Sequence, residues 1–432
     1  MATASAQTST VVATKNPIIP GRGVCDPHMH VFQGRVYLFA SHDCSPSSVD
    51  YWMEDWQIWS SSDLVTWSLE TVIDPANFYV GETRKAWAVD VANANGKYYL
   101  YFSDGNTAIG VASADSPSGP FEDALGRALL DGSASSTREY DPAVFIDEDG
   151  SAYLLFGGPA WAYGEGAGYF IAKLNEDMVS LAEPPRRIEL DHEGDDKVSL
   201  NRIGGQYYLT YASNYATASD VYGPYRFVGN TGASEDHGSY FEWNGQLFNA
   251  FTIFDPTTHY RSSGICYVHR TASGRLSVDP VIVEYGVGRY DARWNKIEAE
   301  WFMKAKGIRK AENPRYGFDV ACTTSGTLLY PNVEHLEQSS GIAFFASCSS
   351  PRGAQVKIYD GEAKQTLLGT CEIPGGSDIS WRSYSISTAE LQQNMPSRSD
   401  LFLEVSVDGL GELRIDYFKL FSRNVVAREF DR

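Results

Sequence analysis

The sequence of 432 residues is short of positive charge and of long apolar runs. It has 35 basic residues against 55 acidic ones, for a formal net charge of −20. It therefore lacks the basic footprint that nucleic-acid binding requires. No stretch approaches the roughly 20 consecutive apolar residues of a membrane span, and no amphipathic helix of useful length is visible. We expect neither a nucleic-acid nor a membrane partner, and the acidic surface suits solubility and a neutral ligand.

Cysteine motifs and a signal peptide are also missing. The six cysteines are scattered without CxxC or zinc-ligand spacing, so they are interpreted as small buried hydrophobes or as one or two disulfides. Residues 1–10 are small and polar and carry no apolar h-region, so no signal peptide is predicted. A signal already removed would leave the same start, and the compartment stays open.

Aromatic residues are abundant, at 13% of the chain, and they recur in one repeated phrase. A glycine turn is followed each time by an alternating aromatic and aliphatic strand, starting at Gly34, Gly96, Gly150, Gly205 and Gly245. The copies lie about 40 to 60 residues apart, the size of a four-stranded propeller blade with insertions. Each copy resembles the second strand of a hairpin. The sequence therefore predicts an all-β fold with a five-bladed β-propeller.

An acidic or histidine side chain begins the first strand of each predicted hairpin. Asp26, Asp90, Asp141, Asp196 and His237 each precede the repeat glycine by about six to nine residues. The innermost strand of a blade lines the central channel, so these side chains should converge there. A single Asp at a strand start more often caps a turn. Repeated placement instead indicates catalysis or a bound cation, since gathered like charges need a balance.

Paired carboxylates across a pocket are what cleavage of a glycosidic bond requires. One acid protonates the leaving oxygen, and one base activates water or attacks the sugar. A wide propeller channel favours the larger separation of an inverting mechanism, and a third carboxylate can raise the pKa of the acid.

The chain resembles glycoside hydrolase family 43 over about residues 15 to 290. The matching segments are Asp26-Pro-His-Met-His, Lys85 to Asp90, Tyr140 to Asp147, Asp196 to Tyr208, Asp236-His-Gly-Ser and Tyr260-Arg261. The resemblance implies a five-bladed propeller and inversion of configuration. It also implies that Asp26 is the general base and that Asp141 orients the acid and raises its pKa.

The position of the general acid departs from the family. A glutamate normally stands in blade four, and here that position reads Asp196, whose side chain is one methylene shorter. Glu193, three residues earlier, is the alternative acid if its loop folds inward, because the proton must reach the glycosidic oxygen. A lost acid and a non-catalytic sugar-binding propeller form the competing hypothesis.

The same resemblance suggests contacts to the sugar and to an ion. Arg261 would pair with Asp141 or a sugar hydroxyl, and Trp87 and Trp56 could stack on the sugar or belong to blade cores. Asp90 and His28 are further candidates for substrate binding, although the pattern favours a structural role for His28. His237 could hold a calcium or another ion in the channel, or only form hydrogen bonds there. No cofactor is expected for the chemistry.

Residues 295–424 form a second predicted domain, after a propeller at 15–290 and a flexible segment at 1–14. Its short strands and Gly- and Ser-rich turns suit a β-sandwich, and it resembles a carbohydrate-binding module of family 6. That resemblance implies a structural calcium on Glu298, Glu300 and Asp416, whose oxygen ligands suit it. Ser377 follows Gly375-Gly376 where relatives carry a tryptophan, so a structural role is favoured over glycan binding.

Together these patterns predict an exo-acting glycosidase that removes terminal sugars from plant polysaccharide or oligosaccharide. α-L-Arabinofuranosidase is the first choice, and β-D-xylosidase and galactosidase are the alternatives within the family.

Overall fold

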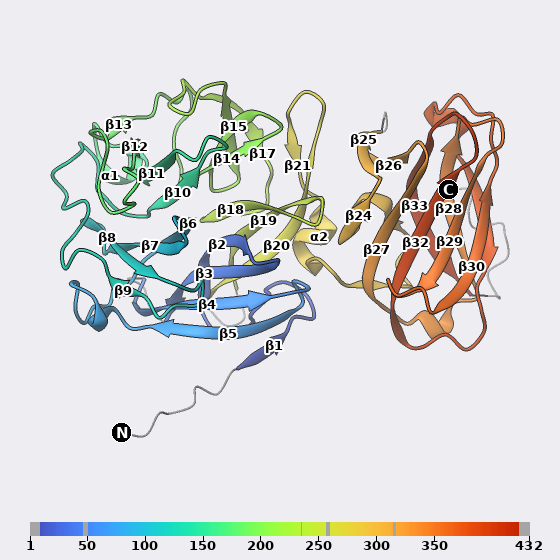
Figure 1. Ribbon diagram of the computed structural model, residues 1–432, viewed down its shortest axis with the longest axis horizontal. Coiled ribbons are helices and arrows are strands. Elements are labelled where there is room, and N and C mark those ends of the chain that lie inside the picture. Colours follow the sequence, from blue (N-terminus) through green and yellow to red (C-terminus); the bar gives the residue numbers. More distant parts are fainter. Residues whose placement is uncertain (1–8, 46–50, 235, 256–259, 314–316, 423–432) are drawn as a thin grey trace. The chain divides into compact units, whose positions relative to one another are not determined.

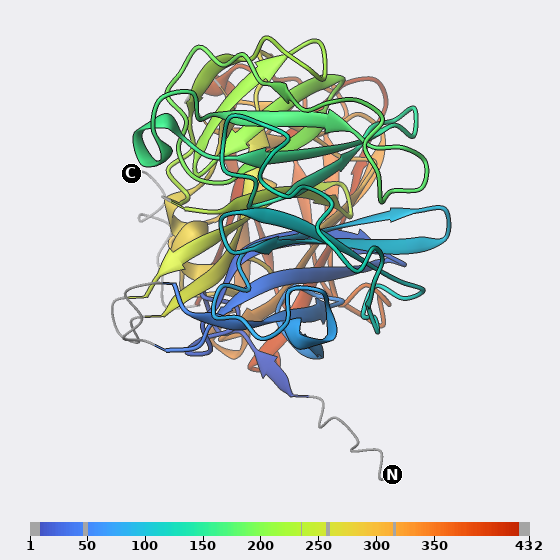
Figure 2. The ribbon, with the colours of Figure 1, turned by 90° about the vertical axis from the view of Figure 1, so that its left-hand side faces the viewer.

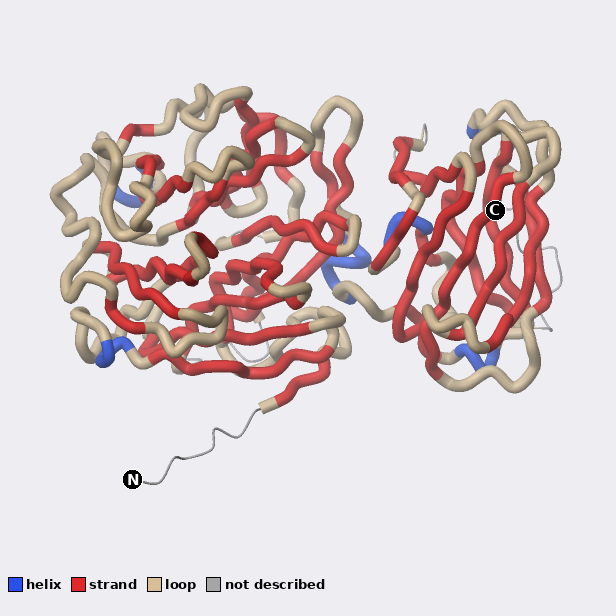
Figure 3. The backbone as a smooth tube through the Cα atoms, in the orientation of Figure 1, coloured by secondary structure: helices blue, strands red, loops and turns tan. Residues whose placement is uncertain are grey.

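The computed structural model describes residues 9–45, 51–234, 236–255, 260–313 and 317–422. Almost all of the regular structure is strand (Figure 3). The α-helices of these residues are α1 (Ala160–Tyr163) and α2 (Pro280–Tyr285). Neither helix in this part of the chain is long and apolar enough to cross a membrane. The all-β class predicted from the sequence is confirmed.

The chain forms two compact units. The first contains Met1–Phe241, Phe248–Cys266 and Val278–Gly286, and the second contains Glu242–Leu247, Tyr267–Ser277 and Val287–Arg432. The second unit thus includes, besides the chain from Val287 on, two shorter segments that belong to hairpin ends of one sheet.

Five sheets follow one another along the chain, and in each of them β-strands that are consecutive in the chain lie side by side, apart from β1 of the first sheet (Figures 1 and 2). The first sheet contains β1 (Thr10–Val12), β2 (Val24–Phe32), β3 (Arg35–Asp43), β4 (Met53–Ser61) and β5 (Thr66–Ile73). The second contains β6 (Val89–Ala94), β7 (Lys97–Asp104), β8 (Ala108–Ala114) and β9 (Glu122–Asp123). Strand β1 pairs with β5, so residues 10–12 form an outer strand within the segment that was expected to be flexible.

Three further sheets repeat the same order. The third contains β10 (Ala143–Ile146), β11 (Ala152–Gly157), β12 (Tyr169–Lys173) and β13 (Arg186–Arg187). The fourth contains β14 (Val198–Ile203), β15 (Gln206–Tyr211), β16 (Asn214–Ala218) and β17 (Arg226–Asn230). The fifth contains β18 (Gly238–Trp243), β19 (Gln246–Phe254), β20 (Arg261–Arg270) and β21 (Leu276–Ser277). These five sheets are consistent with the five blades that the sequence predicts.

The repeated glycine turns close the first hairpin of each of these sheets. Asn95 and Gly96 both have positive φ, 53° and 75°, and Asn244 and Gly245 repeat this at 54° and 80°. Two consecutive residues with positive φ make a type I′ turn, whose twist matches that of the flanking strands. Asn-Gly is the pair that best tolerates this geometry.

Hydrogen bonds between sheets join the innermost strands into a ring. Asn201 of β14 donates to the carbonyl oxygen of Tyr240 in β18. Ser239 of β18 accepts from the backbone N–H of Met29 and donates to the carbonyl of Pro27, so the fifth sheet closes onto β2 of the first.

Large aromatic side chains fill the space between neighbouring sheets. Trp56 packs on Phe78 and Phe102 with ring centroids 6.2 and 5.1 Å away, and it is 1% exposed. Its indole N–H donates to the carbonyl of Trp87. The prediction that Trp56 stacks on a sugar is therefore wrong, because its ring is enclosed in the core between the first two sheets.

The second unit contains two six-stranded sheets. One consists of β22 (Tyr290–Asp291), β24 (Lys304–Lys306), β27 (Ser325–Glu334), β29 (Ala354–Asp360), β30 (Thr366–Ile373) and β32 (Arg398–Val407). The other consists of β23 (Ile297–Glu298), β25 (Arg309–Glu312), β26 (Phe318–Cys322), β28 (Gly341–Cys348), β31 (Ser385–Glu390) and β33 (Leu413–Phe421). Burial alternates along much of β27 in the first of these sheets and of β33 in the second, so each sheet has an apolar face. The sandwich stays a prediction.

Candidate active site

A pocket of about 390 Å³ in the first unit gathers most of the side chains that the repeat placed at strand starts. It is lined by Asp26, Tyr51, Met53, Trp87, Tyr140, Asp141, Trp161, Ala162, Asp195, Asp196, Asp236, His237, Phe254 and Arg261. Asp26, Asp141, Asp196 and His237 thus meet in one cavity, although they are far apart in the chain.

Asp26 and Asp141 share an unusual backbone. Their φ angles are 52° and 51°, which is the left-handed region that costs a non-glycine residue energy. The β2–β3 register is interrupted at Asp26-Pro27, and such irregularities redirect a side chain. Strain of this kind persists where the surrounding structure enforces it, and functional sites concentrate it.

Both strained aspartates are held by a hydroxyl from a neighbouring sheet. The N–H of Asp26 donates to Thr252 Oγ1 at 3.2 Å, and the N–H of Asp141 donates to Ser103 Oγ at 2.9 Å. Because Thr252 lies in β19 and Ser103 in β7, each carboxylate is fixed by the adjacent sheet.

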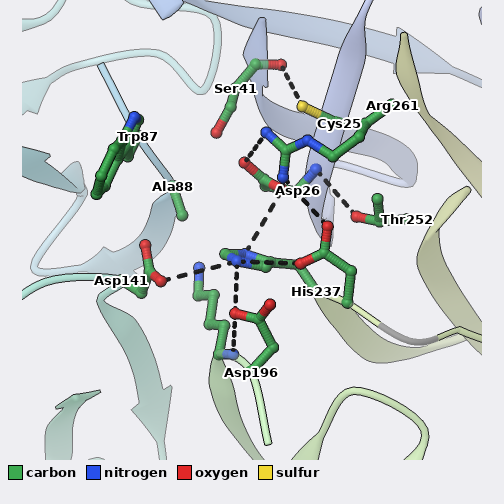
Figure 4. Close-up of polar contacts among 12 residues, drawn as sticks. Cys25, Asp26, Ser41, Trp87, Ala88, Asp141, Asp196, His237, Thr252 and Arg261 are labelled. Carbon is green, nitrogen blue, oxygen red and sulfur yellow. Dashed lines mark hydrogen bonds and ion pairs between the residues drawn. The ribbon is translucent and has the colours of Figure 1, made fainter. Parts of the chain in front are cut away.

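His237 lies at the centre of four carboxylates (Figure 4). Its Nε2 is 3.0 Å from Asp196, 3.5 Å from Asp236 and 3.7 Å from Asp141, and its Nδ1 is 3.8 Å from Asp26. Burial disfavours the charged imidazolium, but the carboxylates outweigh burial and raise the pKa of His237 to about 10. His237 is therefore a cation at neutral pH.

The carboxylates differ in their affinity for protons. Burial raises the pKa of Asp141 to about 7, with a further rise from Asp196 and an opposing effect of His237. Burial also acts on Asp196, but the charge and hydrogen bond of His237 outweigh it and hold the pKa of Asp196 below its usual range. Asp196 shares a hydrogen bond with Asp236, whose pKa is raised by burial and by Asp196.

Arg261 binds the carboxylates on the other side of the pocket. Its Nη1 is 2.7 Å from Asp26 and 3.1 Å from Asp236, and its Nη2 is 3.0 Å from Asp43. Its expected partner Asp141 is not among these bonded residues. The correction follows from the chain path, because Arg261 starts β20 in the fifth sheet, beside the first sheet that carries Asp26.

Asp90 and His28 lie in the channel outside the pocket lining, and both are 1% exposed. Asp90 accepts hydrogen bonds from the N–H of Val144 at 2.8 Å and of Val91 at 2.7 Å, and it contacts His28 and His30 at 2.8 and 2.6 Å. These partners saturate the carboxylate and tie three sheets together. The prediction that Asp90 and His28 contact substrate is therefore wrong, since both are enclosed by protein.

The remaining candidate residues differ in whether they line the pocket. Glu193 is exposed and does not line the pocket, so Asp196 is the better placed of the two candidate acids. Trp87 lines the pocket, and its stacking on a sugar stays a prediction. Tyr51 and Trp161, which the sequence analysis missed, also line it and are 52% and 65% exposed. Nothing in the repeat pattern marks these two, since Tyr51 lies in a loop and Trp161 in the short helix α1, both outside the repeated hairpins.

The surroundings of His237 do not favour a metal ion. His237 belongs to two groups whose ligand atoms all lie within 4.8 Å of one another, one with Asp26 and Asp236 and one with Asp141 and Asp196. Its imidazole is nevertheless protonated at neutral pH, whereas a metal ligand must present a neutral nitrogen. The ammonium of Lys197 also interacts with Asp90, Asp141, Asp26 and Asp196. The positive charges of His237 and Lys197 thus act on the carboxylates that were expected to face a bound cation.

In the second unit, Glu298, Glu300 and Asp416 offer oxygen ligands of the kind that calcium prefers. Within the described residues, these three do not form a group with all ligand atoms within 4.8 Å of one another. Glu298 pairs with Lys296, which also interacts with Asp416 and Glu300. Asn313 Nδ2 donates to Asp416 at 3.1 Å.

Comparison with known proteins agrees with this geometry. The family model for glycosyl hydrolases family 43 matches residues 14–277. An arabinoxylan arabinofuranohydrolase of Bacillus subtilis is 27% identical, over 88% of this chain and 88% of its own. A xylosidase/arabinosidase of Bacteroides ovatus is 28% identical, over 61% of this chain and 96% of its own.

Solved structures give the same result. The crystal structure of a Bacillus subtilis family 43 arabinoxylan arabinofuranohydrolase, in complex with cellotetraose, aligns with a TM-score of 0.54 at 22% identity and shares the fold, over 94% of this chain and 97% of its own. A β-xylosidase/α-arabinofuranosidase from a compost metagenome, in complex with xylotriose and calcium-free, aligns at 0.53 and 28% identity over 62% of this chain and 99% of its own. The chain therefore belongs to glycosyl hydrolases family 43 and is a glycoside hydrolase.

Proposed function

We propose that this enzyme removes terminal pentose units from plant polysaccharide or oligosaccharide with inversion, and that α-L-arabinofuranosides are its main substrates. The names of the Bacillus subtilis and Bacteroides ovatus relatives support the sugar class. The second choice is β-D-xylosidase activity. A galactosidase activity is the third, and an Aspergillus niger relative named β-D-galactofuranosidase xynD, 31% identical over 66% of this chain, supports it.

The arrangement of three aspartates around His237 carries this proposal. Asp26 lies at Nδ1 of the imidazole, and Asp141 and Asp196 lie at Nε2. The base and the acid lie on opposite sides of the imidazole, which keeps the two carboxylates apart, and both line the pocket. Inversion requires such a separation, because a water and the sugar must fit between base and acid.

Asp26 is the general base and Asp196 the general acid in this mechanism. Asp26 takes a proton from water while the water oxygen bonds to the anomeric carbon. The bond from that carbon to the glycosidic oxygen breaks, and Asp196 gives its proton to the leaving oxygen. Water is consumed and no covalent enzyme intermediate forms.

The proton for the leaving group comes from the pair formed by Asp196 and Asp236. A hydrogen bond between two carboxyl groups requires one proton between them, and Asp236 is 4% exposed and shielded from bulk water. The pKa of Asp236 is raised and that of Asp196 is held low, so the shared proton rests on Asp236 and reaches the leaving oxygen through Asp196. Asp141, at 3.7 Å from His237, orients the acid through that imidazole.

For the fold, we propose a five-bladed propeller at about residues 15–290 and a β-sandwich at 295–424. The sandwich has a structural role rather than a glycan-binding one. Calcium on Glu298, Glu300 and Asp416 would require Lys296 to leave Glu298. Such a calcium ion would serve structure and not chemistry.

A panel of p-nitrophenyl pentosides and hexosides tests this function, with proton NMR to follow the anomer that is released first. We expect the highest kcat/KM on the α-L-arabinofuranoside, with the inverted anomer appearing before mutarotation. Release of the retained anomer would overturn the mechanism, and preference for a hexoside would overturn the substrate assignment.

A further inference from the structure

A buried lysine stands beside the proposed general acid and has no part in the mechanism above. Lys197 follows Asp196 immediately and precedes β14, and it is 1% exposed. It does not line the pocket. A fully buried lysine is rare, because burying an ammonium costs free energy unless anions surround it.

The Lys197 side chain crosses the channel. Its Nζ donates to the carbonyl oxygen of Val89 at 3.3 Å. Lys197 belongs to the fourth sheet and Val89 begins β6 in the second, and the third sheet, with β10, comes between them along the chain. Strand β10 contacts both β6 and β14, so this bond spans two sheets that are not neighbours in the ring.

Four carboxylates act on this ammonium. Burial lowers the pKa of Lys197, and Asp90, Asp141, Asp26 and Asp196 oppose that effect. Three of the four line the pocket, and Asp90 lies in the channel with His28 and His30. The ammonium thus joins the charges of the catalytic pocket to those of the deeper channel.

Simple space filling does not account for a lysine here. A methionine would have similar length and flexibility and would avoid the desolvation of a charge. What methionine lacks is positive charge. The position of Lys197 among carboxylates of four sheets therefore indicates an electrostatic role.

We propose that the ammonium of Lys197 is a built-in cation of the channel, which takes the place of a bound divalent metal ion and holds Asp90 and Asp141 in position. The enzyme consequently needs no calcium in the first unit for folding or turnover. Lys197 is a positioning residue, since its charge acts on the aspartates and its side chain does not line the pocket. Only the activity readout depends on the proposed function, and the metal readouts do not.

The first test uses the wild-type chain without any substrate. We expect elemental analysis after dialysis to find no stoichiometric metal bound in the first unit, and thermal unfolding of that unit to be the same in EDTA and in calcium chloride. Calcium bound one-to-one there, or a Tm of the first unit that falls in EDTA, would overturn the proposal. The triple variant Glu298→Gln, Glu300→Gln and Asp416→Asn removes the candidate metal ligands of the second unit. Metal that is lost in this variant was therefore bound in the second unit and does not count against the proposal.

The second test removes the charge and keeps the length. We expect Lys197→Met to lower the Tm and kcat, and to gain a Tm rise of about 5 °C in saturating calcium. The matched control is Lys97→Met, because Lys97 lies on the surface of the second sheet, 49% exposed and paired with Asp115. It should change neither Tm nor kcat.

If the Tm of Lys197→Met falls and calcium does not raise it again, a metal ion cannot replace the ammonium and the proposal is overturned. The proposal is also overturned if Lys197→Met keeps the Tm and kcat of the wild type. If Lys197→Met does not fold, Lys197→Arg becomes the variant that tests the proposal, because its guanidinium keeps the positive charge. Lys197→Arg should fold without metal and keep KM. A requirement of Lys197→Arg for calcium would contradict the proposal.

Discussion

The aspartates of the first and third sheets are built differently from the aspartate of the fourth. The side chains of Asp26 and Asp141 are 3% and 6% exposed, with strained backbones and a hydroxyl from the next sheet on each N–H. The side chain of Asp196 is 37% exposed, and its φ is not in the left-handed region. Two carboxylates are thus fixed and shielded, whereas the third can reach a leaving group at the pocket mouth.

The largest effect should come from neutralising the two carboxylates that exchange protons. Asp26→Asn and Asp196→Asn should each lower kcat/KM about 10²- to 10⁴-fold, the range for general acid or base catalysis. Glu193→Gln serves as the control and should retain full activity. Steady-state kinetics on the preferred p-nitrophenyl pentoside checks this. A large loss in Glu193→Gln with little loss in Asp196→Asn would reverse the assignment of the acid.

The leaving group can sharpen the contrast between Asp26 and Asp196. An acid matters less when the leaving group departs without a proton, so Asp196→Asn should lose less activity on a p-nitrophenyl glycoside than on an oligosaccharide. Asp26→Asn should lose similar activity on both, since water must still be activated. Equal losses for the two variants on both substrates would remove the distinction between acid and base.

A stability measurement probes the cost of burying Asp141. Its pKa is raised in the folded state to about 7, so its stabilising contribution is complete below its unfolded pKa of about 4 and is lost as the pH rises through about 7. Asp141→Asn should therefore be more stable than wild type at pH 8, by about 4 kcal/mol, with the difference shrinking towards pH 4. Urea unfolding at both pH values measures this. A pH-independent difference would place the carboxyl in a solvated site.

The smallest effect concerns the two hydroxyls that hold the fixed aspartates. Thr252→Val removes the hydrogen bond from Asp26, and Ser103→Ala removes the one from Asp141 together with a second one to the carbonyl of Ala88. At about 1 kcal/mol per bond, each variant should reduce kcat about 3- to 10-fold with little change in KM. Ser113→Ala is the control, because Ser113 lies in β8 of the second sheet and outside the pocket lining. Unchanged kcat in both test variants would mean that the φ angles alone fix these side chains.

Much of the fold followed from local chemistry that the sequence displays. The Asn95-Gly96 and Asn244-Gly245 turns specify their hairpins through positive φ, and the repeated spacing gives five such hairpins. The convergence of Asp26, Asp141 and Asp196 followed from that repeat alone. These features depend on a few adjacent residues, which a sequence shows directly.

The residues that the sequence analysis missed depend on contacts across the ring. Asp236 was visible beside His237, but the bond from Arg261 to Asp26 requires the fifth sheet to meet the first. Trp56 and Asp90 were misassigned because strand position does not tell which way a side chain is enclosed. The reach of Lys197 to Val89 depends on the width of the channel, which no local pattern records.

The seam between the last and first sheets has a consequence for how this enzyme fails. Thr252 and Ser239 bring β19 and β18 to the chain around Asp26, so the proposed base sits where the circle of sheets is joined. Any fraying of that joint would displace the attacking water before strands elsewhere separate. On heating, activity should be lost at a lower temperature than the circular-dichroism signal of the strands. Activity therefore reports whether the fifth sheet is still joined to the first.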